Sequence, residues 1–255
     1  MNYEIHQGLV PEHTIFLHGN LASNAWWKPS LEIWENKKIK TQTGSLIFAE
    51  WRGCGKTELS SISELTLQTL ANDYIELIEQ LDLKKVNLVG HSTGGLIGLY
   101  AMRARPELFH RTVLLDSVSA TGIQFGPEMY AAFDQMKANR AICEAVMAST
   151  IYNFPVSQTL LKQIVDDAFG VSEHIWHGIP KLLNNVDFRA ELKNIHQPTL
   201  VLHGEQDTLL PIQGSEELAK LLPNGRFYKI PNRGHSCNVE NPALFVELTE
   251  RFLFG

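Results

Sequence analysis

The chain has 255 residues, of which 44% are hydrophobic and 20% charged, and its formal net charge is -6. This is the composition of a globular protein large enough for one substantial core, which excludes a disordered chain. Charges of both signs are mixed and the three cysteines lack paired spacing, so neither a nucleic-acid-binding face, a disulfide framework nor a zinc site is expected.

No targeting or membrane segment is evident. From Met1 on there is no basic segment followed by an apolar stretch of signal-peptide length, and no later apolar run is long enough to span a bilayer. We therefore expect a cytoplasmic protein without stable membrane insertion. The sequence does not indicate an oligomeric state.

Short apolar runs recur along the chain and predict strands. They are Thr14 to Leu17, Leu46 to Ala49, Val86 to Val89, Thr112 to Leu115, Thr199 to Leu202 and Phe227 to Ile230. Several are apolar at consecutive positions, which is typical of strands covered on both faces of a parallel sheet.

Helix-like segments lie between these runs. The pattern predicts a helix over Leu65 to Leu81, with a capping box at Ser61 to Glu64 and an apolar stripe that includes Leu70 and Tyr74. A last helix is expected after Asn241 as its cap, with Pro242 in the first helical position. Alternating strands and helices indicate an α/β fold.

One segment breaks this alternation. Residues 119–185 are mainly helical in character and rich in aromatic residues and methionines. We interpret this segment as an inserted helical cap, and residues 1–118 and 186–255 as the core domain.

A glycine-rich turn carries the strongest catalytic signal. Gly90-His91-Ser92-Thr93-Gly94 follows one apolar run directly and precedes a helix-like segment, which is the required context for a G-x-S-x-G motif. Such a turn exposes the serine hydroxyl on strained backbone, and the glycines let neighbouring backbone approach. Ser92 is therefore the candidate nucleophile.

A serine needs a base, and the base needs an acid to orient it. His235 follows the last predicted strand in a Gly-His context, and Asp207 lies in the loop after the strand that ends at Leu202. Asp116, at the end of another strand, is the rival acid. We favour Asp207, because Asp116 is also explained as a strand-end residue.

With these residues in chain order Ser, Asp, His, the sequence resembles the α/β-hydrolase family over nearly its whole length. His18-Gly19-Asn20 resembles the oxyanion turn of that family, and the segment 51–57 resembles its R-G-x-G-x-S loop, with Cys54 and Thr57 where histidine and serine are common. The resemblance implies a mostly parallel sheet with helices on both faces and an inserted, mainly helical cap.

The same resemblance implies an oxyanion hole and serine chemistry. Its donors would be the backbone N–H groups of Asn20 and Thr93, with Leu21 as an alternative to Asn20. The implied activity is hydrolysis of a carboxylic ester on a small-molecule acyl substrate, without metal or organic cofactor. Members with an aspartate nucleophile are excluded by Ser92.

The sequence determines the residues that contact the substrate, and the type of bond that is cleaved, less closely than it determines the nucleophile. Leu21, Trp26, Phe125 and Tyr130 are candidate substrate-binding residues, although the aromatic residues also suit core packing. Thioester, lactone, amide and carbon–carbon bond cleavage stay open, because fold does not decide substrate. A ligand sensor that uses a hydrolase pocket is the alternative from another class.

A phosphate-binding loop at Gly55-Lys56-Thr57 is excluded by its spacing. The earlier glycine of that motif would fall at position 50, which is Glu50, and a carboxylate there would repel phosphate. Dinucleotide and metal-binding motifs are likewise not found in the sequence.

Overall fold

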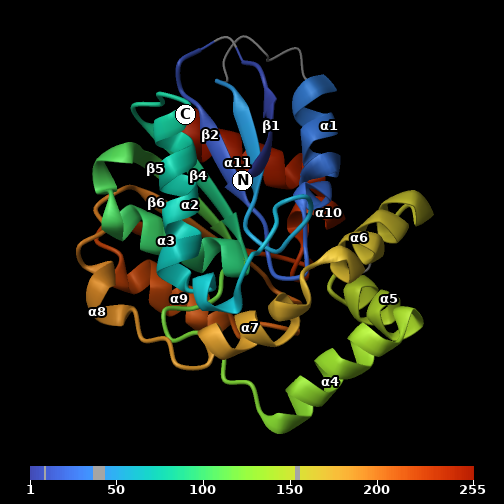
Figure 1. Cartoon of the computed structure of the whole chain (residues 1–255). Coiled ribbons are helices and arrows are strands. Elements are labelled where there is room, and N and C mark those ends of the chain that lie inside the picture. Colours follow the sequence, from blue (N-terminus) through green and yellow to red (C-terminus); the bar gives the residue numbers. More distant parts are fainter. Residues whose placement is uncertain (9, 37–43, 153–155) are drawn as a thin grey trace.

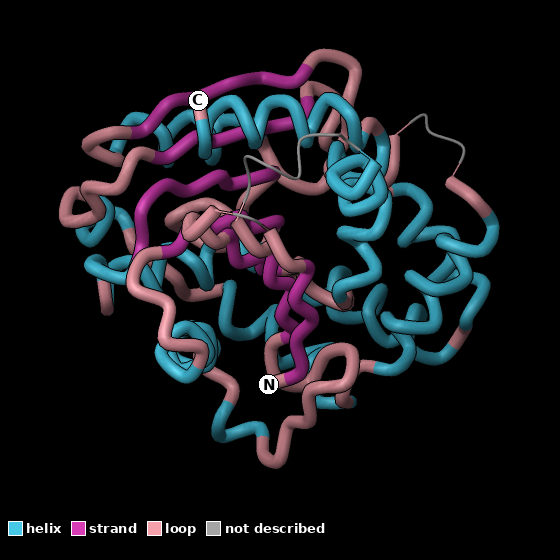
Figure 2. Tube along the Cα trace, turned by 90° about the horizontal axis from the view of Figure 1, so that it is seen from above, coloured by secondary structure: helices cyan, strands magenta, loops and turns pink. Residues whose placement is uncertain are grey.

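A twisted sheet forms the centre of the molecule (Figures 1 and 2). The computed structural model describes residues 1–8, 10–36, 44–152 and 156–255, and in these residues seven strands pair in the order β1-β3-β2-β4-β5-β6-β7. Only β1 runs antiparallel to its neighbour within this sheet. The strands are β1 (Asn2–His6), β2 (Thr14–Leu17), β3 (Leu46–Glu50), β4 (Val86–His91), β5 (Phe109–Leu115), β6 (Thr199–Gly204) and β7 (Gly225–Ile230).

Helices connect the parallel strands and cover both faces of the sheet (Figure 1). The core helices are α1 (Lys28–Asn36), α2 (Leu67–Gln80), α3 (Thr93–Ala104), α8 (Arg189–Leu192), α9 (Ile212–Leu221), α10 (Cys237–Glu240) and α11 (Pro242–Phe254), with 3-10 turns at Asn24–Trp27, Ile62–Glu64 and Pro106–Leu108. None of the helices in the described residues is long and apolar enough to cross a membrane.

Alternate residues of the central strands bury against opposite layers. In β2, Phe16 belongs to the cluster that contains Trp27 and Phe245, on the side of α1 and α11. Its neighbours Ile15 and Leu17 belong to the larger cluster on the side of α2 and α3. Both faces are therefore apolar, which explains why the sequence shows continuous apolar runs here.

Four helices between β5 and β6 depart from the alternation and lie to one side of the sheet (Figure 1). We call them the cap helices: α4 (Pro127–Ala138), α5 (Arg140–Ser149), α6 (Gln158–Gly170) and α7 (Glu173–Leu183). They fall within the segment expected to form the cap, of which residues 153–155 lie outside the described residues. The domain boundaries at 118 and 186 stay a prediction.

The prediction of a capping box at Ser61 to Glu64 is wrong. Ser61 caps the short 3-10 turn by accepting from the N–H of Ser63, and α2 begins later, at Leu67, with the Thr66 hydroxyl accepting from the N–H of Thr69. The Glu64 carboxylate instead pairs with Arg52 at 3.0 Å. By contrast, Asn241 caps α11 as expected, because its side chain accepts from the N–H of Leu244.

Strand β1 was not expected from the sequence. It pairs with β3 alone at the edge of the sheet, and most of its residues are partly or fully exposed. A half-exposed edge strand has no continuous apolar run, so a search for such runs misses it.

Candidate active site

Ser92 lies on the turn between β4 and α3, at the carboxyl ends of the parallel strands. Its backbone is in the left-handed region with φ +54°, which is unusual for a residue other than glycine. The Ser92 N–H donates to Leu115 O at 3.0 Å, and Ser92 O accepts from Val118. These bonds to β5 and to the loop that follows it hold the strained residue in place.

Glycines beside Ser92 permit the backbone to pack closely around it. A Cβ on Gly94 would lie 2.4 Å from Leu17 O, and a Cβ on Gly90 would lie 2.6 Å from the Gly95 Cα. A Cβ on Gly19 would lie 3.6 Å from the Ser92 hydroxyl oxygen. The turn expected to supply oxyanion donors is therefore packed against the nucleophile candidate.

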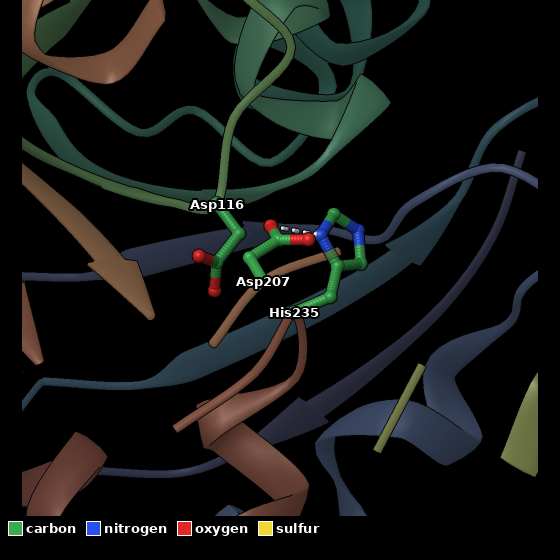
Figure 3. A group of neighbouring side chains, drawn as sticks. All are labelled: Asp116, Asp207 and His235. Carbon is green, nitrogen blue, oxygen red and sulfur yellow. Dashed lines mark hydrogen bonds and ion pairs between the residues drawn. The ribbon is translucent and has the colours of Figure 1, made fainter. Parts of the chain in front are cut away.

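His235 and Asp207 come together from two loops that follow β7 and β6 (Figure 3). Nδ1 of His235 lies 2.7 Å from Asp207 Oδ2, and the other carboxylate oxygen accepts from the N–H groups of Leu209 at 2.7 Å and Leu210 at 3.1 Å. Burial alone would raise the pKa of Asp207, but the charge and hydrogen bond of His235 and the two N–H donors outweigh it and lower this pKa. The carboxylate is thus held ionised beside the imidazole.

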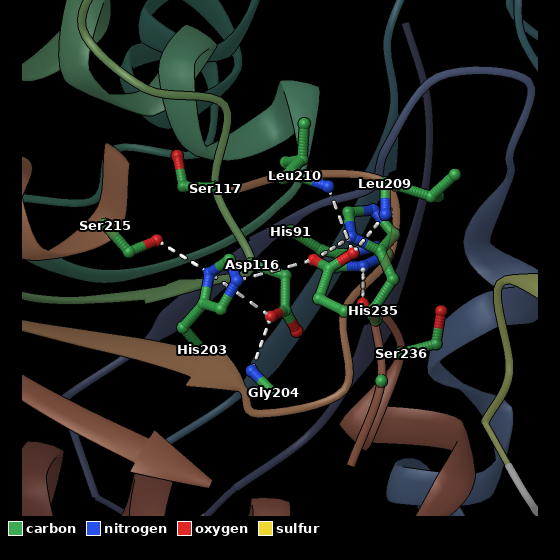
Figure 4. A network of polar contacts seen from close by, with 12 residues as sticks. His91, Asp116, Ser117, His203, Gly204, Leu209, Leu210, Ser215, His235 and Ser236 are labelled. Atoms are coloured by element: carbon green, nitrogen blue, oxygen red, sulfur yellow. Dashed lines mark hydrogen bonds and ion pairs between the residues drawn. The ribbon is translucent and has the colours of Figure 1, made fainter. Parts of the chain in front are cut away.

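Asp116, the rival acid, makes a different set of contacts. Its Oδ1 accepts from the Gly204 N–H at 2.7 Å, and Oδ1 lies 3.6 Å from Nδ1 of His203 (Figure 4). Burial, followed by the nearby charge of Asp207, raises the pKa of Asp116 well above its ordinary value. The geometry therefore makes Asp207, and not Asp116, the hydrogen-bond partner of His235.

Asp116, Asp207 and His235 are also the group of side chains in the described residues that lie close enough together to be tested as metal ligands. Ligand atoms of Asp116, Asp207 and His235 all lie within 4.8 Å of one another. The hydrogen bonds described above already engage Asp207, His235 and one oxygen of Asp116. Asp207 is the carboxylate bonded to His235 and Asp116 is bonded to Gly204, which fits an oriented histidine better than an open metal site.

Two further histidines near Ser92 are buried in the neutral form. Nε2 of His91 lies 2.8 Å from the His235 carbonyl oxygen, and Nδ1 of His18 lies 2.9 Å from Gly19 O. Burial is the largest cause that lowers the pKa of His91 to about 3 and that of His18 to about 4. Because a carbonyl only accepts, each ring donates from the nitrogen that contacts it.

Burial of neutral His91 makes folding sensitive to acid. Its pKa falls from 6.5 to about 3 on folding, so between these values the unfolded chain binds more protons and stability is lost as the pH falls. We expect His91→Gln to reduce the loss of unfolding free energy between pH 7 and pH 5 by up to about 2 kcal/mol. Urea unfolding at both pH values measures this, and an unchanged difference contradicts it.

A mainly apolar cavity of about 250 Å³ opens beside Ser92 and His235. The core contributes the segment from Gly19 to Ala22 and Trp26, with His91 and Thr93 beside the serine. Other lining residues come from the cap and nearby loops: Ile123, Phe125, Met129, Ala132, Phe133, Met136, Val146, Met147, Thr150, Leu183, Leu209 and Leu210. The cap helices therefore supply much of the wall.

The candidate substrate-binding residues divide between this cavity and other places. Leu21, Trp26 and Phe125 line the cavity, whereas Tyr130 is not among its lining residues. The Tyr130 ring instead packs edge-on against His177, at 5.6 Å between ring centroids. Trp27, next to Trp26, packs in the core against Phe16 and Phe245.

Sequence reasoning did not single out Leu209, Leu210 or Met129 as lining residues. The two leucines lie shortly after Asp207, and their apolar character in an otherwise polar loop was the available signal. Leu209 is exposed and Leu210 is buried. Met129 is 43% exposed at the rim of the cavity.

The glycine and lysine loop after β3 encloses a carboxylate. The N–H of Lys56 donates to Glu50 Oε2 at 2.8 Å, and a Cβ on Gly55 would collide with the same carboxylate. Thr57 donates its hydroxyl to Glu50 O at 2.6 Å. The Lys56 amide already binds the Glu50 carboxylate, which would repel a phosphate.

Residues 13–242 match the alpha/beta hydrolase fold family. The chain belongs to the α/β hydrolase fold family. It is 27% identical over 263 residues to a putative carbamate hydrolase, RutD, of Pseudomonas syringae pv. syringae (strain B728a), covering 94% of this chain and 93% of that protein. This α/β hydrolase is thus similar to proteins named as hydrolases, which supports hydrolase activity in general.

Solved structures share the fold of this α/β hydrolase. A bromoperoxidase from Bacillus anthracis superposes with a TM-score of 0.86 at 21% identity, covering 98% of this chain and 94% of that one. An esterase from Exiguobacterium antarcticum gives a TM-score of 0.86 at 21% identity, covering 99% and 95%. At this identity the likeness shows the fold, and the reaction has to be argued from the site.

Proposed function

We propose that this α/β hydrolase is a serine hydrolase that cleaves a carboxylic ester or related acyl bond through an acyl-enzyme on Ser92. One observation carries the proposal: strained Ser92 and His235 line the same mainly apolar cavity, and His235 is hydrogen-bonded to Asp207 behind it. A nucleophile, an oriented base and a substrate volume are the parts that acyl transfer needs.

In the first half of the proposed reaction, the Ser92 hydroxyl oxygen attacks the carbonyl carbon of the ester while Nε2 of His235 takes its proton. The tetrahedral intermediate collapses, the carbon–oxygen bond to the alcohol breaks, and His235 returns the proton to the leaving alcohol. Ionised Asp207 holds the imidazole in the tautomer with its proton on Nδ1.

In the second half, water attacks the acyl-enzyme. His235 removes a proton from the water, the bond to Ser92 breaks, and the same proton returns to the serine oxygen as the carboxylic acid leaves. The proposed reaction consumes one ester and one water and needs no oxidant or cofactor.

Developing negative charge on the carbonyl oxygen would be stabilised by backbone donors. Thr93 is the first residue of α3, so its N–H has no acceptor within the helix. The segment of Asn20 and Leu21 lines the cavity opposite it. We assign the oxyanion hole to Thr93 with Asn20, and Leu21 is the one-residue alternative.

Reaction with a fluorophosphonate, combined with turnover of p-nitrophenyl esters, tests the proposal. We expect the probe to modify Ser92 and p-nitrophenyl butyrate to be hydrolysed. Ligand binding without either reaction would instead favour a sensor, and preferred turnover of carbamates, thioesters or lactones would change the bond type but keep the nucleophile. The cytoplasmic location expected from the sequence is part of the proposal and is tested by cell fractionation.

A further inference from the structure

The cavity beside Ser92 offers no partner for a charged substrate group. None of its lining residues, within the described part of the chain, is lysine, arginine, aspartate or glutamate. His91 is buried and neutral, since burial lowers its pKa to about 3. His235 faces the cavity, but its other side is paired with the negative charge of Asp207. A carboxylate entering the cavity would find no free cation there.

The free energy of transfer from water into the cavity therefore differs between neutral and anionic acyl groups. An ionised carboxylate that moves from water into this cavity loses the favourable free energy of its hydration. No cation or set of hydrogen-bond donors in the cavity compensates for that loss. An apolar acyl chain is stabilised against the same wall, because its apolar surface is removed from water. Met129, Met136 and Met147 in this wall are unbranched and adapt to different chain shapes.

Resting on the function proposed above, we propose that this cavity selects esters whose acyl group is apolar and uncharged and rejects acyl groups that end in a carboxylate. The selection lies in the wall supplied by the cap helices and not in the Ser92, His235 and Asp207 machinery.

Matched substrates test the selection. Rates are measured for p-nitrophenyl pentanoate, the p-nitrophenyl monoester of glutaric acid and its neutral methyl ester, which share the five-carbon acyl chain. We expect kcat/KM for the charged monoester to be lower than for the pentanoate by roughly 100-fold or more. The neutral methyl ester should stay within about tenfold of the pentanoate, which separates charge from size.

A cation placed at the rim should reduce the discrimination. In Met129→Lys the stem lies along the rim while the ammonium stays in water, because Met129 is 43% exposed. We expect the ratio of charged to neutral kcat/KM to rise by about tenfold. Met129→Gln, which is polar but neutral, is the matched control and should leave the ratio within about threefold.

Fluorophosphonates keep this inference distinct from the proposed function. A butyl probe and a probe with a carboxylate-ended chain are compared for their rates of reaction at Ser92, so no turnover is needed. Failure of both to modify Ser92 overturns the proposed function. Modification at rates within about threefold, or equal kcat/KM for the charged and neutral esters, overturns only the selection.

A second inference concerns a buried carboxylate behind the histidine loop. Glu240, in α10, is 2% exposed, and its oxygens accept from three backbone N–H groups. These belong to Gly234 at 2.7 Å, Ser236 at 3.1 Å and Tyr152 at 3.0 Å. The first two flank His235 on both sides, and Tyr152 belongs to the segment that follows α5.

This carboxylate therefore joins the loop that carries His235 to the cap side of the cavity. Both of its oxygens are engaged, Oε1 by the N–H groups of Tyr152 and Ser236 and Oε2 by that of Gly234. We infer that Glu240 is a positioning residue that holds His235 in register with Ser92. In Glu240→Gln the side chain keeps its shape, but one oxygen becomes an amide that would face an N–H donor.

Active-site titration separates positioning from a purely structural role. We expect Glu240→Gln to lower kcat per titrated Ser92 by roughly 10- to 100-fold with KM within about threefold, because small misplacement of a catalytic group is costly. Glu247→Gln is the control and should leave kcat unchanged. Glu247 is exposed, and its carboxylate lies 3.4 Å from Arg251. A loss of titratable sites with unchanged kcat per site overturns the inference.

Amide hydrogen exchange in the unaltered protein provides a test that needs no variant. The N–H groups of Tyr152, Gly234 and Ser236 should exchange slowly, since each donates to a buried carboxylate. Exchange of Gly234 and Ser236 at the rate of exposed loop amides overturns the inference.

Discussion

Ser92→Ala lowers kcat/KM for p-nitrophenyl butyrate by at least roughly 10⁴-fold, if Ser92 is the nucleophile proposed above. Alanine removes the hydroxyl that would form the acyl bond, and only binding and the oxyanion donors remain. The substitution keeps the backbone of a residue with φ +54°, so little change in stability is expected beyond the lost hydroxyl. Initial rates, together with the mass of the probe-treated protein, measure the effect.

Ser117→Ala is the matched control for this experiment. Ser117 is buried close to the same turn, and its hydroxyl donates to Val118 O at 2.9 Å. It should keep activity within about tenfold, because one neutral hydrogen bond contributes only about 1 kcal/mol to stability. Full activity in folded Ser92→Ala, or an equal loss in both variants, would refute the role assigned to Ser92.

Asp207→Asn lowers kcat by roughly 10⁴-fold while the fold is retained. The asparagine amide can donate to Nδ1 of His235, which places the ring proton on Nε2, where the base must accept from the serine. The loss of charge also removes stabilisation of the protonated imidazole. The measurement is kcat over the pH range in which the protein stays folded.

The same change at the rival carboxyl distinguishes the two acids. Asp116→Asn should cost less than about tenfold in kcat, because Asp116 bonds the Gly204 N–H and not His235, and the amide oxygen of asparagine can accept the same bond. A large loss in Asp116→Asn with a small loss in Asp207→Asn would reverse the assignment.

Local sequence patterns predicted the elements that are decided by neighbouring residues. The central strands β2, β4 and β5 each contain a short apolar run because both of their faces are covered. The cap of α11 was predicted from Asn241 and Pro242, which act within one helical turn. The start of α2 was misjudged because Ser61 and Thr66 both suit an N-cap, and the pairing of Glu64 with Arg52 lies outside any local pattern.

The candidate site shows the same division. Asp207 and Asp116 are both acids near strand ends, and the sequence favoured Asp207 because Asp116 is also explained as a strand-end residue. Only the fold distinguishes their environments. Asp207 is hydrogen-bonded to His235 and to two backbone N–H groups, whereas Asp116 is buried and bonded to the Gly204 N–H. Tyr130 and Phe125 were both candidate substrate-binding residues, and only the fold separated them, since Phe125 lines the cavity and the Tyr130 ring packs against His177.

The sequence by itself determined the α/β class, the serine turn and the order of the candidate residues. Backbone turns and apolar periodicity depend on residues that are neighbours in the sequence. The tertiary structure alone decided which carboxyl meets His235, which cap side chains line the cavity and that Glu240 reaches both sides of the histidine. Those contacts join residues up to 88 positions apart, such as Tyr152 with Glu240, and pairing at such distances depends on how the layers pack.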